Sequence, residues 1–166
     1  MSLKDHPYRF FGTGEGLSAL WQPTLNWMQG QKLVALYGVW DRDTGLFWQD
    51  LPLLARFEAG VLMIHYRRGI MGGFALGWNE MLPEERPLWP AETRQRYAFD
   101  EEDERQNLAW KERPESPALA GQALQAVELL EKEGRLAALG FLFAEKSLFL
   151  PGGQEMAPQL KERERP

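Results

Sequence analysis

The sequence predicts an α+β, mainly β fold, in which two related β-hairpin or meander units pack into one domain. The first observation is an internal repeat: "GQKL" at residues 30–33 returns as "GQAL" at 121–124. The second is that each copy is followed by apolar segments broken by turn residues, which is typical of antiparallel strands. The third is composition, because 44% hydrophobic and 26% charged residues are typical of a globular chain. At 166 residues, one shared core is expected.

The repeat sets the expected organisation of the chain. The expected segments are a lead-in at 1–18, a first β unit at 19–82, a connector at 83–107, a second β unit at 108–153 and a charged tail at 154–166. The glycine-rich "GTGEG" at 12–16 lacks the residues of a phosphate loop and is expected to be flexible. The final "QLKERERP" is expected to be frayed.

The alignment of the two copies extends beyond the repeated letters. It pairs "ALW" at 19–21 with "LAW" at 108–110, and it changes offset by five residues at the turn after the first strand. Insertions confined to a turn are what duplicated hairpins would show, although chance similarity of Leu- and Ala-rich strings is the alternative. The aligned apolar pairs are Leu33 with Leu124, Leu36 with Val127, Phe57 with Phe143, Leu62 with Leu148 and Ile64 with Leu150.

In the first copy, four segments have the β-branched and aromatic content of strands. They are "KLVALYGVW" at 32–40, "LLARFE" at 53–58, "VLMIHY" at 61–66 and "GFALGW" at 73–78. Gly30 and Gly121 are expected at the turn into the first strand of each unit, with Leu33 and Leu124 pointing inward.

The second copy is ambiguous when it is taken alone. Ser116 and Pro117 could begin a helix over 117–133 that ends at Gly134, because the intervening residues are good helix formers. The repeat instead predicts a strand over 122–130, and we favour the strand because tertiary context often overrides propensity.

The connector at 83–107 is rich in proline and contains the acidic run "DEEDE" at 100–104. Proline at this spacing opposes long regular elements, although a short helix could begin at the acidic run. Its aromatic residues indicate that it packs onto the β units.

Composition excludes several functional classes. The absence of cysteine excludes disulfides, thiolate nucleophiles and iron–sulfur ligation, and favours a cytoplasmic location. No segment approaches the roughly 20 apolar residues of a membrane span, so no membrane association is predicted. The net charge is −5, and Arg67 with Arg68 is the single adjacent basic pair, so nucleic acid is not a predicted partner.

Acidic residues around the first long turn are weak candidates for a metal site. Asp41, Asp43 and Asp50, with Glu58 nearby, could converge on a divalent cation or act as an acid/base pair. Aspartate is also a common residue of hairpin turns, and that structural interpretation is the favoured one. No cofactor is predicted.

Aromatic and basic residues of the first unit are candidates for ligand binding. Trp40, Trp48 and Trp78 could line an apolar pocket between the two units, and His65 or Arg67 could hold a polar group there. Tryptophans of a β domain more often belong to the core, and the two basic residues also fit a solvated strand end.

The sequence contains no convincing catalytic constellation. The leading hypothesis is therefore a non-enzymatic module that binds a protein partner or associates with itself, with enzymatic activity left open. The alternative is a carrier of a small apolar or amphipathic ligand, with its pocket between the units. A carboxylate- and metal-dependent hydrolase is the third hypothesis, because Asp41, Asp43 and Asp50 could support it.

Overall fold

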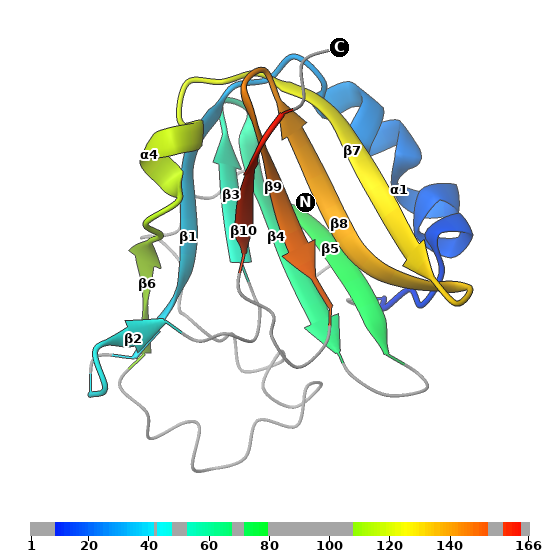
Figure 1. The fold of residues 1–166 in the computed structure, drawn as a ribbon, viewed down its shortest axis with the longest axis horizontal. Coiled ribbons are helices and arrows are strands. Elements are labelled where there is room, and N and C mark those ends of the chain that lie inside the picture. The colour runs from blue at the N-terminus through cyan, green and yellow to red at the C-terminus, as the bar shows by residue number, and fades with distance from the viewer. Residues whose placement is uncertain are drawn as a thin grey trace.

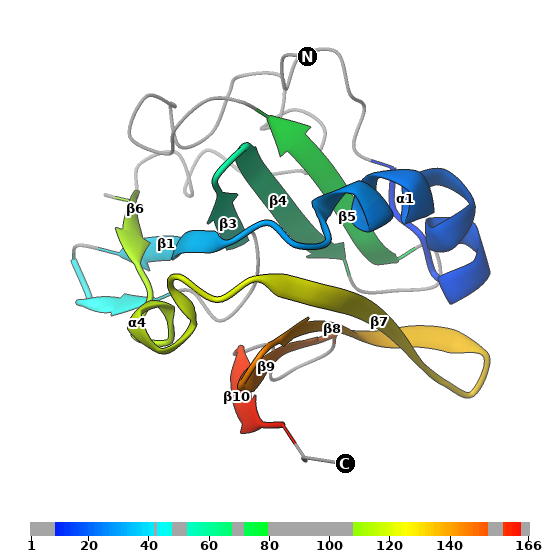
Figure 2. The same cartoon turned by 90° about the horizontal axis from the view of Figure 1, so that it is seen from above.

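The described residues form a mainly β, α+β fold made of two antiparallel sheets in two layers. The structure is a computed structural model, and it describes residues 9–41, 43–47, 53–67, 72–79, 108–152 and 158–163. Figure 1 shows one sheet in front of the other, and Figure 2 shows both layers from above.

The first sheet runs in the order β2-β1-β3-β4-β5, and β6 pairs with the other edge of β1. All its pairings are antiparallel, and β1, β3, β4 and β5 form a simple meander. Its strands are β1 (Leu33–Asp41), β2 (Leu46–Phe47), β3 (Leu53–Phe57), β4 (Gly60–Arg67), β5 (Gly73–Asn79) and β6 (Leu108–Glu112).

The second sheet is a four-stranded antiparallel meander in the order β10-β9-β8-β7. A helix precedes the meander of each sheet: α1 (Gly14–Met28) comes before β1, and the single turn α4 (Ser116–Leu119) comes before β7. The strands are β7 (Leu124–Lys132), β8 (Arg135–Phe143), β9 (Lys146–Pro151) and β10 (Gln159–Glu162).

The main core lies between the two sheets. Alternate residues of the longer strands face this space, as the pleat requires, and one cluster of buried side chains joins both sheets with α1 and α4. Phe57 of β3 and Phe143 of β8 are among its largest buried members. Figure 2 shows α1 at the side of the two layers where β5 and β7 lie, and α1 contacts both strands. The helix therefore covers one open side of the sandwich.

The repeated "GQ" segments pair with each other where the two sheets meet. Lys32 and Ala123 form an antiparallel bridge. The hydrogen bonds around it keep the same pattern when the two segments are exchanged. They run from Gly30 N–H to Leu124 C=O (2.7 Å), Gly121 N–H to Leu33 C=O (2.8 Å), Leu33 N–H to Gln122 C=O (3.1 Å) and Leu124 N–H to Gln31 C=O (2.9 Å).

Both segments enter their strands through the same turn. Gly30 has φ +87° and Gly121 has φ +83°, each after a residue with ψ 134°, which is the geometry of a type II turn. A register shift then occurs at Leu33/Ala35 in the first sheet and at Leu124/Ala126 in the second. Leu33 and Leu124 are both 1% exposed and lie in the main core, as the sequence predicted.

The two repeated glutamines differ in their hydrogen bonds. Gln122 Nε2 donates to Ala118 C=O (2.7 Å), and Gln122 Oε1 accepts from Glu145 N–H (3.1 Å). Gln31 Oε1 is buried and has no hydrogen-bond partner among the residues that the structure describes. The side-chain amide of Gln122 therefore has partners for both its nitrogen and its oxygen, whereas the amide oxygen of Gln31, at the same place in the repeat, has none among the described residues.

This difference predicts unequal effects of one substitution at the two sites. Gln122→Leu should cost about 1–2 kcal/mol of unfolding free energy, because it leaves a carbonyl and an N–H without their partner. Gln31→Leu should change stability by less than about 0.5 kcal/mol, or raise it, because it removes an unpaired oxygen. Urea denaturation of both variants checks this, and equal losses would contradict the assigned hydrogen bonds.

The expectation of a flexible lead-in at 12–16 is wrong. Thr13 is the N-cap of α1, its Oγ1 accepting from Gly16 N–H (3.1 Å), and the helix continues to Met28. This helix crosses the boundary drawn at residue 18. The match of 19–21 with 108–110 is also wrong as a structural equivalence, because it aligns part of α1 with part of β6.

The strand predicted over 122–130 is confirmed by β7, and the helix alternative over 117–133 is reduced to the turn α4. Ser116 Oγ accepts from Leu36 N–H (2.9 Å) and donates to Glu112 Oε1 (2.8 Å), and the residue is fully buried. It therefore fixes α4 to β1 and β6. Pairing with β8 along the whole of β7 outweighs the helix propensity of the segment.

The expected fraying of the last eight residues is also wrong for 159–163. Residues Gln159–Glu162 form β10, which pairs with β9, and Lys146 Nζ lies 3.5 Å from Glu162 Oε1. Leu160 packs against the main core. One inward-facing leucine in a charged segment is enough to hold a short edge strand there.

Candidate interaction surface

Helix α1 is held at its N-terminus by two acceptors. Thr13 provides the N-cap, and Glu131 Oε1 of β7 accepts from Gly14 N–H (2.7 Å). A carboxylate at this end also interacts favourably with the helix dipole. The helix is therefore anchored to the second sheet before its first turn is complete.

The two sides of α1 differ sharply in exposure. Its buried side, which carries Leu17, Trp21, Leu25 and Met28, packs in the main core. Leu20 is 55% exposed and Trp27 is 56% exposed. Because they are seven residues apart, these two large apolar side chains lie on one side of the helix, two turns apart.

Trp27 continues this exposed surface onto the first sheet. Its ring meets that of Trp78 of β5 edge to face, with 5.5 Å between the centroids and 90° between the planes. Trp78 is half-buried and packs on the main core. We call Leu20, Trp27 and Trp78 the α1 patch. Within this patch, Trp78 belongs to β5, which pairs with β4.

Trp40 lies in a different part of the molecule from Trp78. β1 and β5 are three strands apart in the sheet order, about 14 Å at the usual strand spacing. Trp40 contacts Phe47 (4.9 Å between centroids), and Lys111 Nζ lies 3.6 Å from its ring centroid. The structure therefore does not bring Trp40 and Trp78 together. Trp48 lies outside the described residues.

His65 lies in the middle of β4 and is 6% exposed. Since it alternates with Ile64 and Tyr66, which belong to the main core, it faces the other side of the first sheet, with Val61 and Met63. Burial lowers the pKa of His65 to about 3, because desolvation disfavours the imidazolium. Arg67 is the last residue of β4. His65 and Trp78 thus lie on opposite faces of the sheet.

The acidic candidates adopt a turn geometry. Asp41 Oδ1 accepts from Asp43 N–H (2.9 Å) and from Thr44 N–H (3.4 Å), an arrangement typical of an Asx turn. Within the described ranges, the structure shows no group of three His, Cys, Asp or Glu side chains that could hold a metal ion. Asp50 lies outside those ranges.

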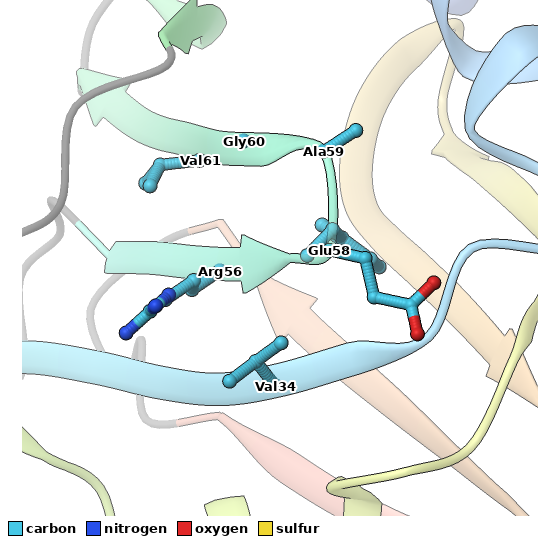
Figure 3. A pocket seen from close by; sticks show the side chains of 7 residues that line it. Val34, Arg56, Glu58, Ala59, Gly60 and Val61 are labelled. Carbon is cyan, nitrogen blue, oxygen red and sulfur yellow. The ribbon is translucent and has the colours of Figure 1, made fainter.

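A hollow of about 130 Å³ lies at the β3–β4 turn, beside the start of β1. Figure 3 shows Arg56 next to Val34, with the Glu58 carboxylate pointing away from the guanidinium. Val34, at the register shift of β1, is 42% exposed. We call this site the Arg56 hollow.

Comparison with known proteins adds no functional assignment. No family model, no curated protein and no solved structure matches the chain. In the described part of the chain, no helix is long and apolar enough to cross a membrane.

The sequence prediction of site residues missed Leu20, Trp27 and Arg56. A signal for the first two was present: Leu17, Trp21, Leu25 and Met28 recur at helical spacing and define a buried side, which leaves Leu20 and Trp27 outside it. No such signal exists for Arg56, because its position beside a hollow depends on the register of three strands.

Proposed function

We propose that this chain is a non-enzymatic binding module that recognises a protein partner, or a second copy of itself, through the α1 patch. The observation that carries the proposal is the 56% exposure of Trp27, whose ring is held in place by Trp78. Tryptophan is enriched among the residues that contribute most to protein interfaces, because it buries a large area and loses little conformational entropy.

The uncharged character of this side of α1 supports the same proposal. Between Leu20 and Trp27, this side carries Pro23 and Thr24 and no charged residue. Charged residues are depleted at the centres of interfaces, where they would have to be desolvated. The patch therefore has the composition of an interface centre.

We also infer that the two meanders are copies of one ancestral unit. Support comes from the matching turns at Gly30 and Gly121, the matching register shifts, and the symmetric hydrogen bonds between the repeated segments. The pair Leu33↔Phe57 corresponds to Leu124↔Phe143, and Leu53↔Ile64 corresponds to Leu139↔Leu150. In this proposal the functional surface is a difference between the copies, because α1 has 15 residues and α4 has four.

The carrier and hydrolase hypotheses gain no supporting observation from the geometry. Trp40 and Trp78 do not converge, and Asp41 uses its carboxylate in a local turn. Side chains of both sheets fill the space between the units. The interaction module is therefore the function that the described residues support best.

The proposal predicts that Leu20→Ser with Trp27→Ser abolishes association. Purified chain is examined by sedimentation velocity for self-association, and tagged chain captures partners from its native host for quantitative mass spectrometry. We expect the double variant to lose the complex by at least about 100-fold in affinity, because hot-spot residues contribute about 2 kcal/mol or more each.

Leu46→Ser is the matched control. Leu46 is 66% exposed, so the substitution removes an equally accessible apolar side chain away from the α1 patch. It should leave association unchanged. Loss of the complex in both variants, or no association of the unaltered chain with any partner or with itself, would contradict the proposal.

A further inference from the structure

We propose that the Arg56 hollow binds a carboxylate. The inference goes beyond the proposed function and does not depend on it, because it concerns the chemistry of the hollow alone. That chemistry follows from the state of Arg56 and from a comparison of the two sheets.

Arg56 is half-buried, so its guanidinium is accessible to a ligand. Among the described residues, the structure gives this guanidinium no hydrogen bond or ion pair. Its guanidinium points away from Glu58, the acidic residue of the hollow. A guanidinium offers five N–H donors in a planar fork that fits a carboxylate with two parallel hydrogen bonds. The unused donors therefore favour a carboxylate as the ligand.

The size of the hollow fits such a group. The hollow is partly open, and its volume of about 130 Å³ leaves room for a small group such as a carboxylate. Val34, which is 42% exposed, provides apolar surface beside Arg56 for the carbon chain of such a group. An acidic side chain, with its charged end on an apolar stem, has this shape.

The corresponding place in the second sheet is already filled by a side chain. By strand register, Gln125, Phe143 and Glu145 correspond to Val34, Phe57 and Ala59 of the hollow. The Arg163 side chain reaches the first two, because its Nη1 donates to Gln125 Oε1 and to Phe143 C=O (2.9 Å), and the backbone N–H of Arg163 donates to Glu145 C=O (3.2 Å). The place is therefore one that accepts a side chain with a charged end.

The charge is reversed between the two places. Leu142 occupies the position in β8 that Arg56 occupies in β3, and the occupant there is the cation of Arg163. In the first sheet the cation belongs to the hollow, so the complementary occupant is an anion. The difference in charge therefore selects an acidic group.

The hollow and the α1 patch lie on opposite faces of the first sheet. Val61, which lines the hollow, clusters with Met63 on the outer face, whereas Trp78 packs on the main core between the sheets. Binding in the hollow is therefore independent of the α1 patch.

The test uses the whole ¹⁵N-labelled chain and small probes, so it needs no partner. Two probes carry one carboxylate each: N-acetylglutamate α-methylamide presents a side-chain carboxylate, and N-acetylalanine presents a chain-end carboxylate. N-acetylglutamine methylamide is the neutral control, and ionic strength is kept constant. The backbone amides of residues 58–60 and the Nε–H of Arg56 are followed by NMR.

We expect saturable shifts of these signals with a dissociation constant on the order of 10 mM, and no saturable shift with the neutral probe. Arg56→Gln should weaken binding at least tenfold, and Arg56→Lys should weaken it less, since lysine keeps the charge but loses the fork. Lys32→Gln removes the same charge from an exposed position nearby and should leave binding unchanged.

Saturation by the glutamate probe identifies a side-chain carboxylate as the ligand, whereas saturation by N-acetylalanine alone identifies the chain end of a partner. Either result supports carboxylate binding in the Arg56 hollow. No saturable shift with either carboxylate up to about 100 mM, ten times the expected constant, would overturn the inference. So would equal binding by Arg56→Gln. Since none of these outcomes depends on the α1 patch, failure here is distinct from failure of the proposed function.

Discussion

Replacing Gly73 by alanine is expected to destabilise the chain by about 3–4 kcal/mol. Gly73 has φ +144°, and a Cβ at this position would lie 1.9 Å from the carbonyl oxygen of Phe11. Phe11 and Phe74 exchange two backbone hydrogen bonds here (2.8 and 3.0 Å). The added methyl group would therefore force apart the backbone pair that follows Gly73.

The damage should reach both sheets. The segment that Gly73 contacts also joins the second sheet, because Gly12 C=O accepts from Leu136 N–H of β8 (2.8 Å), and α1 begins two residues later. Phe11, which is 7% exposed, would have to leave its place in the core. Loss of this connection removes hydrogen bonds, apolar burial and the support of α1 together.

Urea denaturation followed by circular dichroism measures the loss, with Gly45→Ala as the control. Gly45 also has a positive φ, +69°, but a Cβ there would meet no atom within 4 Å. Its replacement should cost about 1 kcal/mol, from backbone strain alone. Equal costs for the two variants would show that the close approach of Phe11 to Gly73 is not made in solution.

The second large effect is a pH dependence caused by His65. Its pKa of about 3 in the folded chain lies below the ordinary value of 6.5, which applies to the unfolded chain. Between these values the unfolded state binds the proton and the folded state does not. The free energy of unfolding is therefore not reduced by His65 above about pH 6.5, and it falls as the pH is lowered from 6.5 towards 3.

The expected size of this loss is about 2 kcal/mol at pH 5, since each pH unit below 6.5 costs about 1.4 kcal/mol. Most carboxylates with ordinary pKa values remain charged at pH 5, so the window from pH 7.5 to 5 reports mainly on the imidazole. At lower pH, acidic residues also titrate.

The measurement compares unfolding free energies across this window for His6→Gln and for His6→Gln with His65→Gln. The first protein keeps only one of the two histidines of the chain, so the imidazole that titrates is that of His65. The double variant should be less stable at pH 7.5 but lose little further stability by pH 5. Parallel pH profiles for the two proteins would contradict the burial of a neutral His65.

Much of the β architecture was predictable from sequence, because the positions of strands are encoded locally. Alternating apolar residues and the repeated Gly-Gln turn identified β1 and β7 and the inward direction of Leu33 and Leu124. Other strands, including β6 and β10, lacked such a pattern. β6 occupies a segment aligned by its letters with part of α1, and β10 depends on pairing with β9 and on Leu160. These strands are determined by tertiary contacts.

The surface was harder to predict than the core. Trp78 was a candidate from the sequence, but its neighbour in space is Trp27, 51 positions earlier in the chain. Trp27 lies in α1, and the glycine-rich segment at the start of this helix had been interpreted as flexible. Arg56 was not a candidate at all, because its environment combines a turn, a register shift and an adjacent strand. Contacts of this kind can be identified only from the fold.

The most direct test of the α1 patch as an interface is site-specific photo-crosslinking in the native host. The photoreactive residue p-benzoylphenylalanine replaces Trp27 in one variant and Leu46 in a second, and covalent adducts are identified by mass spectrometry after irradiation. We predict one discrete adduct from position 27, with a partner protein or a second copy of the chain, and none from position 46. No adduct from position 27, or the same adducts from both positions, would contradict the account.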